Sequence, residues 1–238
     1  MNTKMKVLAL ALLGLAGYAG SAVAGCPSSP VPPWTAAPVF QGTVAIVAGG
    51  LDGSACRLDS SIAAAASGAA FATVEDDTPA GEVRYRAQFM VNLDNLTSQS
   101  LLAGVQLFSA SNTANGTSIW LTVFGDGSGN RFLGYFVKDT SQASGVYSNS
   151  TPLAAGPNRI EFDLQTGAAG AGGITFWINN TTEGSPTVPT HNVTNDAYTI
   201  DTAFVGLAAP TPQYVTAFSG TTVGFDRFDS RRQTFIGG

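Results

Sequence analysis

The sequence has 238 residues, a formal net charge of −5 and only 11% charged side chains, whereas about a quarter is usual in a soluble protein. Such a chain lacks the clustered Lys and Arg residues that bind a nucleic-acid backbone, which excludes nucleic acid as a partner. Its polar surface has to come from Ser, Thr, Asn and Gln instead, as in many extracellular β-proteins.

The N-terminus has the pattern of an export signal. Lys4 and Lys6 precede an apolar run over residues 7–20, and Ala22 and Ala24 supply the small residues that a signal peptidase reads. The run is shorter than the roughly 20 residues that a spanning helix needs. We therefore expect cleavage of residues 1–24, secretion or cell-surface display, and no membrane span.

The two cysteines, Cys26 and Cys56, can pair in an oxidising compartment. Such a disulfide adds about 3 to 4 kcal/mol to stability in the chain-entropy model. Residues 23–26 also resemble the lipobox of bacterial lipoproteins, in which Cys26 is acylated and Cys56 stays unpaired. We favour the disulfide because it accounts for both cysteines, and the lipid anchor stays open as the alternative.

After a proline-rich, extended lead-in over residues 25–38, the pattern predicts a single domain over residues 39–238. Short alternating segments separated by turn clusters indicate strands, with little helix beyond a turn near residues 60–67. We therefore predict an all-β, two-sheet antiparallel sandwich. The expected strands are 43–48, 55–63, 70–74, 82–93, 101–109, 117–124, 131–138, 159–165, 173–179, 203–208 and 223–235, with turn clusters at 112–116, 125–130 and 139–150.

The clearest strands are residues 159–165 and 174–179, where apolar side chains occupy every second position. Together with a return strand at residues 223–229, they resemble the laminin-G-like branch of the concanavalin A-like jelly rolls over residues 82–235. The resemblance implies two stacked sheets, frequently a carbohydrate or protein ligand, and sometimes calcium. It carries over no individual ligand-binding residue.

Catalytic constellations are incomplete in this sequence. His191 is the only histidine, so a Ser-His-Asp triad and a zinc site both lack support. Jelly-roll polysaccharide lyases need a catalytic His or Tyr beside an Arg- and Gln-rich strand, and no Gln-Ile-His-like motif is present. We assign no catalytic residue.

A divergent glycosidase is the remaining enzymatic interpretation. Glu161 and Asp163 share one strand face, but Thr166 stands where the second Glu of a Glu-x-Asp-x-x-Glu strand would be, so the two-carboxylate mechanism lacks its proton donor. The competing interpretation is that Glu161 and Asp163 pair with Arg84, Arg86 or Arg159 on the surface.

The binding interpretation starts from Trp120 and Trp177, which alternate with apolar residues and therefore belong to the polar faces of their strands. An exposed indole stacks on the CH face of a sugar while polar neighbours bind its hydroxyls. Thr175, Asn179, Glu161 and Asp163 are the polar candidates. Alternatively, a long loop over residues 139–150 or 181–197 covers an indole, and the two indoles need not share a sheet.

Residues 125–130 (GDGSGN) have oxygen-bearing side chains spaced as in some calcium loops, but they lack the later bidentate Glu. Asp-Gly between two strands is first a hairpin signal, so we expect no cofactor and keep calcium as the second interpretation. The chain is thus predicted to be an extracellular, non-catalytic, lectin-like module. A structural or adhesive protein that binds proteins or itself is the alternative, and a divergent glycosidase using Glu161 is the third hypothesis.

Overall fold

The computed structural model describes residues 25–96, 101–142, 145–231 and 233–237; the expected signal peptide lies outside them. Fourteen strands and one short helix follow one another in these residues. The bounds are β1 Val39–Phe40, β2 Gly42–Ala48, β3 Cys56–Ile62, β4 Phe71–Asp76, β5 Arg84–Asn92, β6 Leu101–Asn112, β7 Gly116–Asp126, β8 Arg131–Val137, β9 Val146–Leu153, β10 Pro157–Gln165, β11 Gly172–Ile178, β12 Val188–Val193, β13 Thr202–Ala208, α1 Pro212–Phe218 and β14 Thr222–Arg231.

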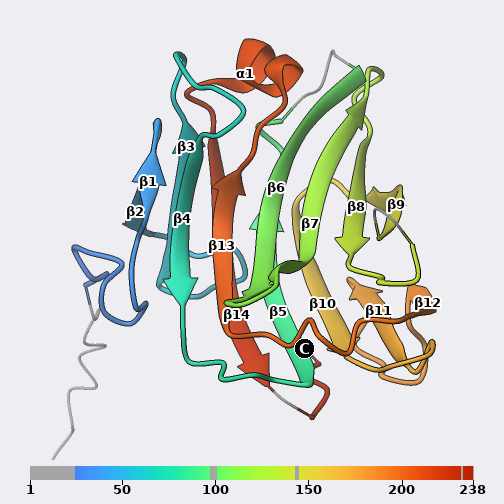
Figure 1. The fold of residues 1–238 in the computed structure, drawn as a ribbon. Coiled ribbons are helices and arrows are strands. Elements are labelled where there is room, and N and C mark those ends of the chain that lie inside the picture. The colour runs from blue at the N-terminus through green and yellow to red at the C-terminus, as the bar shows by residue number, and fades with distance from the viewer. Residues whose placement is uncertain (1–24, 97–100, 143–144, 232, 238) are drawn as a thin grey trace, which may run out of the picture.

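The strands form two antiparallel seven-stranded sheets that stack face to face, which confirms the predicted all-β sandwich (Figure 1). Sheet A has the order β1-β4-β13-β6-β7-β8-β9, and sheet B has the order β12-β11-β10-β5-β14-β3-β2. Figure 1 views the molecule from the side of sheet A, with sheet B behind it. Strands close in sequence are thus distributed over both layers, and each layer presents one face inward and one outward.

Aromatic side chains from both sheets meet in the core. Phe108 of β6 contacts Phe162 of β10 with ring centroids 5.0 Å apart, and Phe89 of β5 stacks on Phe108 at 6.0 Å. All three are almost completely buried, and for Phe162 this follows from the alternation in β10. At a bulge in β6 the register shifts between Gln106 and Phe108, so that the neighbours Leu107 and Phe108 are both buried.

The helix α1 is a feature that the sequence prediction lacks. The hydroxyl of Thr211 caps its first turn by accepting from Tyr214 N, and Pro212 occupies the first helical position. Tyr214 and Phe218 are buried, so the helix closes one end of the sandwich against β6. Two edge strands, β9 and β12, also lie where the sequence indicated turns or loops.

The lead-in is attached to the sandwich at several points. Cys26 and Cys56 form a disulfide, as the first interpretation predicted, so that Cys26 carries no free thiol for the lipobox alternative. Trp34 packs against Phe228 with ring centroids 4.9 Å apart, and Ala36 forms an isolated bridge with Glu75. These contacts hold the lead-in against the edges of β3, β4 and β14.

Candidate carbohydrate-binding faces

The strand register brings aromatic residues into one row across the outer face of sheet A. In an antiparallel sheet, directly opposed residues point to the same side, so each paired position extends the row. From β13 to β9 the row contains Phe204, Ser109, Trp120, Phe136 and Tyr147. With strands about 4.8 Å apart, these five positions span about 19 Å.

Neighbouring rows add further rings to the same face. One row pairs Gly104 with Phe124 and Phe124 with Phe132. At Gly104 an added Cβ would come within 2.7 Å of the Phe124 ring, so the glycine leaves room for that ring. Another row pairs Phe71 with Phe40 of the edge strand β1. We call the outward side chains of these rows the aromatic face of sheet A.

Most rings of the aromatic face are only partly covered, whereas Phe136 is buried, with 9% of its surface exposed. Trp120 and Phe136 stack with centroids 3.9 Å apart and an interplanar angle of 11°, and Trp120 is half-buried. Because Phe136 covers one side of the indole, the free side is toward β6, where Ser109 is the register neighbour. At the two ends of the face Tyr147 is 50% exposed and Phe40 is 49% exposed.

Charged groups are scarce on the aromatic face. Within the described residues of the three rows, the only Asp, Glu, Lys, Arg or His is Glu75, opposite Phe204. The floor consists of small or neutral polar residues such as Ser109, Gln106 and Thr122. This composition suits stacking and hydroxyl recognition, and it gives little support for acid–base chemistry.

The outer face of sheet B gathers most of the other residues that the sequence singled out. One row contains Trp177, Glu161, Gln88 and Asp229. The adjacent row contains Thr175, Asp163, Arg86 and Arg231. Trp120 and Trp177 therefore lie on opposite sides of the sandwich, and the two indoles cannot form a single platform.

Trp177 is 3% exposed, so the exposed-platform interpretation is wrong for this residue. Its indole N–H donates to the carbonyl of Glu183 at 2.9 Å, in the β11–β12 loop that belongs to the segment proposed as a possible cover. Phe235 covers it as well, with ring centroids 5.2 Å apart and an interplanar angle of 61°. The covered-indole alternative thus describes Trp177.

Asp163 has the structural role that the sequence offered as the competing interpretation. Arg84 donates to its two oxygens at 3.0 and 2.7 Å, and Arg86 Nε lies 2.9 Å from its Oδ2. Arg86 also donates to Glu183 at 2.7 Å. Asn179 is likewise structural: its side-chain oxygen accepts from Arg159 N at 2.8 Å.

Glu161 is completely buried. Its oxygens accept the backbone N–H groups of Ile236 and Gly237 at 2.8 and 3.1 Å. Burial raises the pKa of the Glu161 carboxyl above its ordinary value, although these two hydrogen bonds and the nearby Arg159 and Arg86 act in the opposite direction. In this conformation the carboxylate cannot reach a substrate, which weighs against the glycosidase hypothesis.

Other candidate sites are occupied by local structure. His191 is exposed on the edge strand β12. In the β7–β8 hairpin, the Asp126 carboxylate accepts from Ser128 N, Asn130 N and Asn130 Nδ2, and these bonds lower its pKa.

Within the described part of the chain, no cluster of His, Cys, Asp or Glu suits a metal ion, and no helix is long and apolar enough to cross a bilayer.

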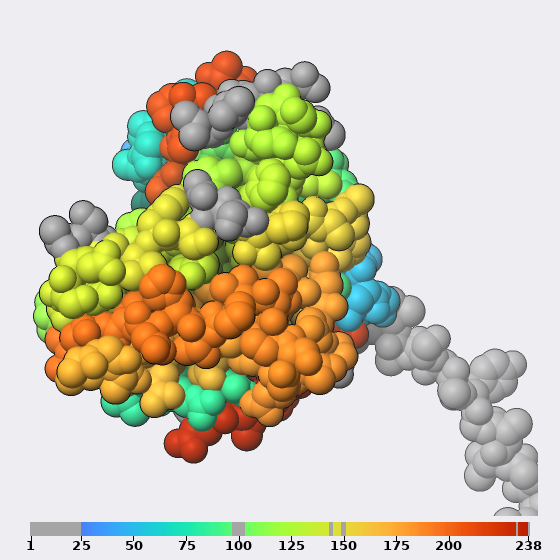
Figure 2. Space-filling view, turned by 90° about the vertical axis from the view of Figure 1, so that its right-hand side faces the viewer, coloured from blue at the N-terminus to red at the C-terminus, as the bar shows by residue number. Residues whose placement is uncertain are grey.

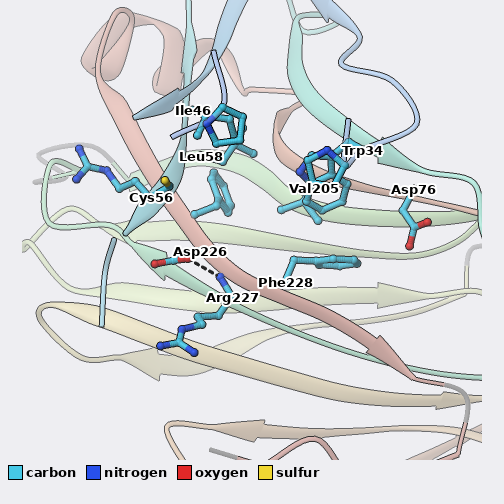
Figure 3. Close-up of a pocket in the computed structure, with 13 residues that line it drawn as sticks. Trp34, Ile46, Cys56, Leu58, Asp76, Val205, Asp226, Arg227 and Phe228 are labelled. Atoms are coloured by element: carbon cyan, nitrogen blue, oxygen red, sulfur yellow. Dashed lines mark hydrogen bonds between the residues drawn. The ribbon is translucent and has the colours of Figure 1, made fainter. Parts of the chain in front are cut away.

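A pocket of about 480 Å³ lies between the lead-in and the edges of both sheets (Figure 3). Two of its rim arginines are paired, Arg57 with Asp59 at 2.6 Å and Arg227 with Asp52 at 2.9 Å. Asp226 accepts from Leu51 N. The contacts of Asp226 and Arg227 hold the loop between β2 and β3 in place. The apolar wall contains Trp34, Ile46, Leu58, Val205, Phe225 and Phe228.

Sequence reasoning identified Trp120 but missed its aromatic neighbours. Strand β8 held the missing signal: Phe132 and Phe136 alternate with the buried residues Leu133, Tyr135 and Val137. A strand that is apolar on both faces has either to be covered on its outer side or to present a binding surface there. The contribution of Phe204 depends on the order of the strands, which no local pattern gives.

Comparison with known proteins gives structural matches only. No protein-family model matches the sequence, and no curated protein sequence is significantly similar to it. The fold is similar to that of an endo-β-1,4-glucuronan lyase from the fungus Trichoderma reesei, with 14% identity, a TM-score of 0.60, and coverage of 87% of this chain and 94% of that one.

Two further structures are similar over most of their length. Alginate lyase Aly36B, as a K143A/M171A mutant in complex with alginate trisaccharide, has 16% identity and a TM-score of 0.53, covering 88% of this chain and 98% of that one. The cellulose induced protein Cip1 has 16% identity and a TM-score of 0.52, covering 86% and 94%. The chain therefore has the concanavalin A-like jelly-roll fold that its sequence resembles.

Proposed function

We propose that this chain is an extracellular, non-catalytic carbohydrate-binding module, and that its ligand is a neutral polysaccharide bound along the aromatic face of sheet A. The observation that carries this proposal is the register row Phe204, Ser109, Trp120, Phe136 and Tyr147. The proposed binding surface therefore includes Trp120, as the sequence predicted. Its other aromatic residues are neighbours of Trp120 on sheet A, and Trp177 is not part of it.

The spacing of the strands is wide enough for a sugar ring above Ser109. Phe204 and Trp120 flank Ser109 in register, one on each neighbouring strand. Their strands are therefore about 9.6 Å apart, and a ring held between two others at van der Waals distance needs about 7 to 8 Å. A pyranose can stack its CH face on the free side of the indole, while Ser109 and Gln106 bind its hydroxyls.

The charge of the face favours a neutral glycan. A polyanionic chain needs Arg, Lys or suitably placed hydrogen-bond donors to compensate for its carboxylates, and the described residues of the aromatic face supply Glu75 as their only ionic group. Elimination next to a uronate also needs a base and a stabilising group for the developing charge. These absences support a binding role over a lyase role.

Two other observations agree with this proposal. The disulfide between Cys26 and Cys56 is consistent with an oxidising compartment and hence with secretion or surface display. Among the proteins of similar fold, two are named as polysaccharide lyases and one of these was solved with alginate trisaccharide. A carbohydrate ligand is therefore a natural class to test on this fold.

The test is affinity electrophoresis in gels containing a neutral β-glucan, a mannan, or alginate. We expect at least one neutral polysaccharide to retard the wild-type chain and alginate to leave it unretarded. Absorbance of unsaturated uronate ends should not rise on incubation with alginate or glucuronan. Retardation by alginate alone would contradict the neutral-ligand proposal, and concentration-dependent oligomers with no glycan binding would favour the adhesive alternative.

A further inference from the structure

A segment near the C-terminus, residues 233–237, covers part of the outer face of sheet B through contacts with Glu161, Trp177 and Arg86. These three side chains and the neighbouring Gln88 point away from the core, yet each is at most 8% exposed. We call these four residues the covered face and residues 233–237 the tail. Outer sheet faces are commonly solvated in antiparallel sandwiches, so a covered face of polar and charged groups needs an explanation.

The tail is held by contacts to side chains and has no assigned strand pairing. Within the tail, residues 233–234 form a bend and residues 235–237 have no regular secondary structure. Two of its backbone N–H groups, from Ile236 and Gly237, bind the two oxygens of Glu161. The guanidinium carbon of Arg86 lies 5.3 Å from the centroid of Trp177 and 5.7 Å from that of Phe235. The attachment therefore depends mainly on Glu161, Trp177 and Arg86.

The covered face contains a group whose burial opposes permanent packing. Glu161 is completely buried, and the tail encloses it through the backbone N–H groups of Ile236 and Gly237. Burial raises the pKa of the Glu161 carboxyl, so enclosing its charged form opposes closure. Local opening of a segment held by few contacts requires much less free energy than global unfolding.

The contacts of the tail reproduce the chemistry of a bound sugar. A pair of vicinal hydroxyls can donate to both oxygens of a carboxylate, as the N–H groups of Ile236 and Gly237 do for Glu161. A pyranose ring can pack on an indole where Phe235 packs on Trp177. Gln88 is the register neighbour of Glu161. Its side-chain oxygen accepts from Arg159, and its amide N–H groups are the further donors at this position.

We propose that the covered face is a second carbohydrate site, for a neutral sugar with vicinal hydroxyls, and that the tail occupies it as an intramolecular mimic. Displacing the tail exposes Glu161, Trp177 and Arg86 together. This site is on the opposite side of the sandwich from the aromatic face, and it does not depend on the proposed function of that face.

The experiment removes the tail in a chain whose aromatic face is disabled. A Trp120→Ala variant and the same variant without residues 233–238 are applied to an array of neutral gluco-, manno- and galacto-oligosaccharides. We expect the shortened chain to bind at least one of these sugars about tenfold more tightly than its full-length parent, the scale of one indole–sugar contact. Adding Trp177→Ala should abolish the gain, and a synthetic peptide of residues 233–238 should displace the sugar.

Each alternative outcome is informative. A folded shortened chain that binds the peptide but no sugar would overturn the proposal and leave the tail as a structural latch. A gain that survives Trp177→Ala would overturn it as well. If the shortened chain fails to fold, Phe235→Ala in the full-length Trp120→Ala chain replaces it, and the absence of any gain in sugar binding there would refute the mimic. Failure of the proposed function appears separately, as unchanged binding when Trp120 alone is replaced.

Discussion

The outer faces of the two sheets each contain one tryptophan in a register row, but the surroundings of these indoles differ. On sheet A, Trp120 lies between Ser109 and Phe136 and remains partly exposed. On sheet B, Trp177 lies beside Glu161 and is covered by the β11–β12 loop and the tail. Alternation along a strand therefore identifies which side chains point outward, but it does not show which of them meet solvent.

In Figure 1 the strands of sheet A lie in front, with helix α1 at one end. Figure 2 looks onto the side of the sandwich, where the β10–β12 region forms a continuous packed surface. We expect substitutions on the two faces to separate binding from stability, because the aromatic face has few ionic contacts while the face of sheet B contains several.

The largest expected effect is on the stability of sheet B. Arg86 is 3% exposed and contacts Asp163, Glu183 and the Trp177 ring. Arg86→Ala leaves Asp163 with Arg84 as its remaining partner and removes a positive charge near the buried Glu161. It should therefore lower the free energy of unfolding by about 3 kcal/mol. Urea denaturation measures this loss.

The matched control is on the side of sheet A. Lys138, whose ammonium lies 5.5 Å from the Tyr198 centroid, should lose at most about 1 kcal/mol on replacement by Ala. If Arg86→Ala and Lys138→Ala lowered the free energy of unfolding equally, the ionic contacts of Arg86 would contribute no more to stability than the contact between Lys138 and Tyr198.

A smaller effect is expected at the centre of sheet A. Gly206 has φ of +132°, and a Cβ there would come 2.3 Å from the Ala72 carbonyl oxygen. Gly206→Ala should therefore destabilise the chain by about 2 kcal/mol through backbone strain, and it should disturb the row through Phe204. Gly184→Ala is the control, because a Cβ at Gly184 meets no atom within 4 Å. An unchanged unfolding midpoint for Gly206→Ala would contradict the strained register at this position.

The next effect depends on pH. The pKa of Glu161 is raised above 4.5 by burial, which outweighs its hydrogen bonds and the charges of Arg159 and Arg86. Between the ordinary and the raised value the folded chain binds more protons than the unfolded chain, so stability falls as pH rises through this window. Glu161→Gln should remove that part of the decline in urea midpoints measured upward from pH 4.5. If the wild type and the Glu161→Gln variant showed the same decline in urea midpoint with pH, a group other than Glu161 would be responsible for it.

Carboxylates in the turns of sheet A should have the opposite influence. The pKa of Asp126 is lowered by hydrogen bonds from Asn130 and Ser128, and that of Asp201 by Thr113. Their stabilising contribution is lost as pH falls through these lowered values. The pH range above 4.5 therefore isolates Glu161 from them.

The smallest expected effect concerns the space above Ser109. Ser109→Tyr places a ring between Phe204 and Trp120, which should weaken glycan binding several-fold by filling the position of the sugar. The fold should tolerate it, because the Ser109 side chain points outward and is half-buried. Titration of the variant with the neutral oligosaccharide measures this effect. Unchanged affinity would place the ligand elsewhere on the face.

The sequence predicted the elements whose signals are local. Strands β10 and β11 alternate strictly because both belong to the interior of a sheet with one face in the core. In contrast, β12 contains Pro189 and several exposed polar residues, since an edge strand has little surface to bury. Helix α1 has only 7 residues, and its main sequence signal is the Thr211–Pro212 cap.

The site was less predictable, for a physical reason. Burial of Trp177 depends on Phe235, which is far away in the sequence, and the row through Trp120 depends on which strands become neighbours. Ser109 and Phe204 are 95 residues apart in the chain, yet they are directly paired. Local periodicity determines the side of a strand on which a residue lies, whereas the chain topology decides what lies next to it.

The most direct test is calorimetric titration of the full-length chain and two single variants with one neutral oligosaccharide that the wild type binds. Trp120→Ala should weaken binding about tenfold or more, since it removes the exposed stacking surface, while Trp177→Ala should leave the affinity within about twofold, because its indole is covered. Loss of binding in Trp177→Ala with none in Trp120→Ala would contradict the assignment of the ligand to the aromatic face of sheet A.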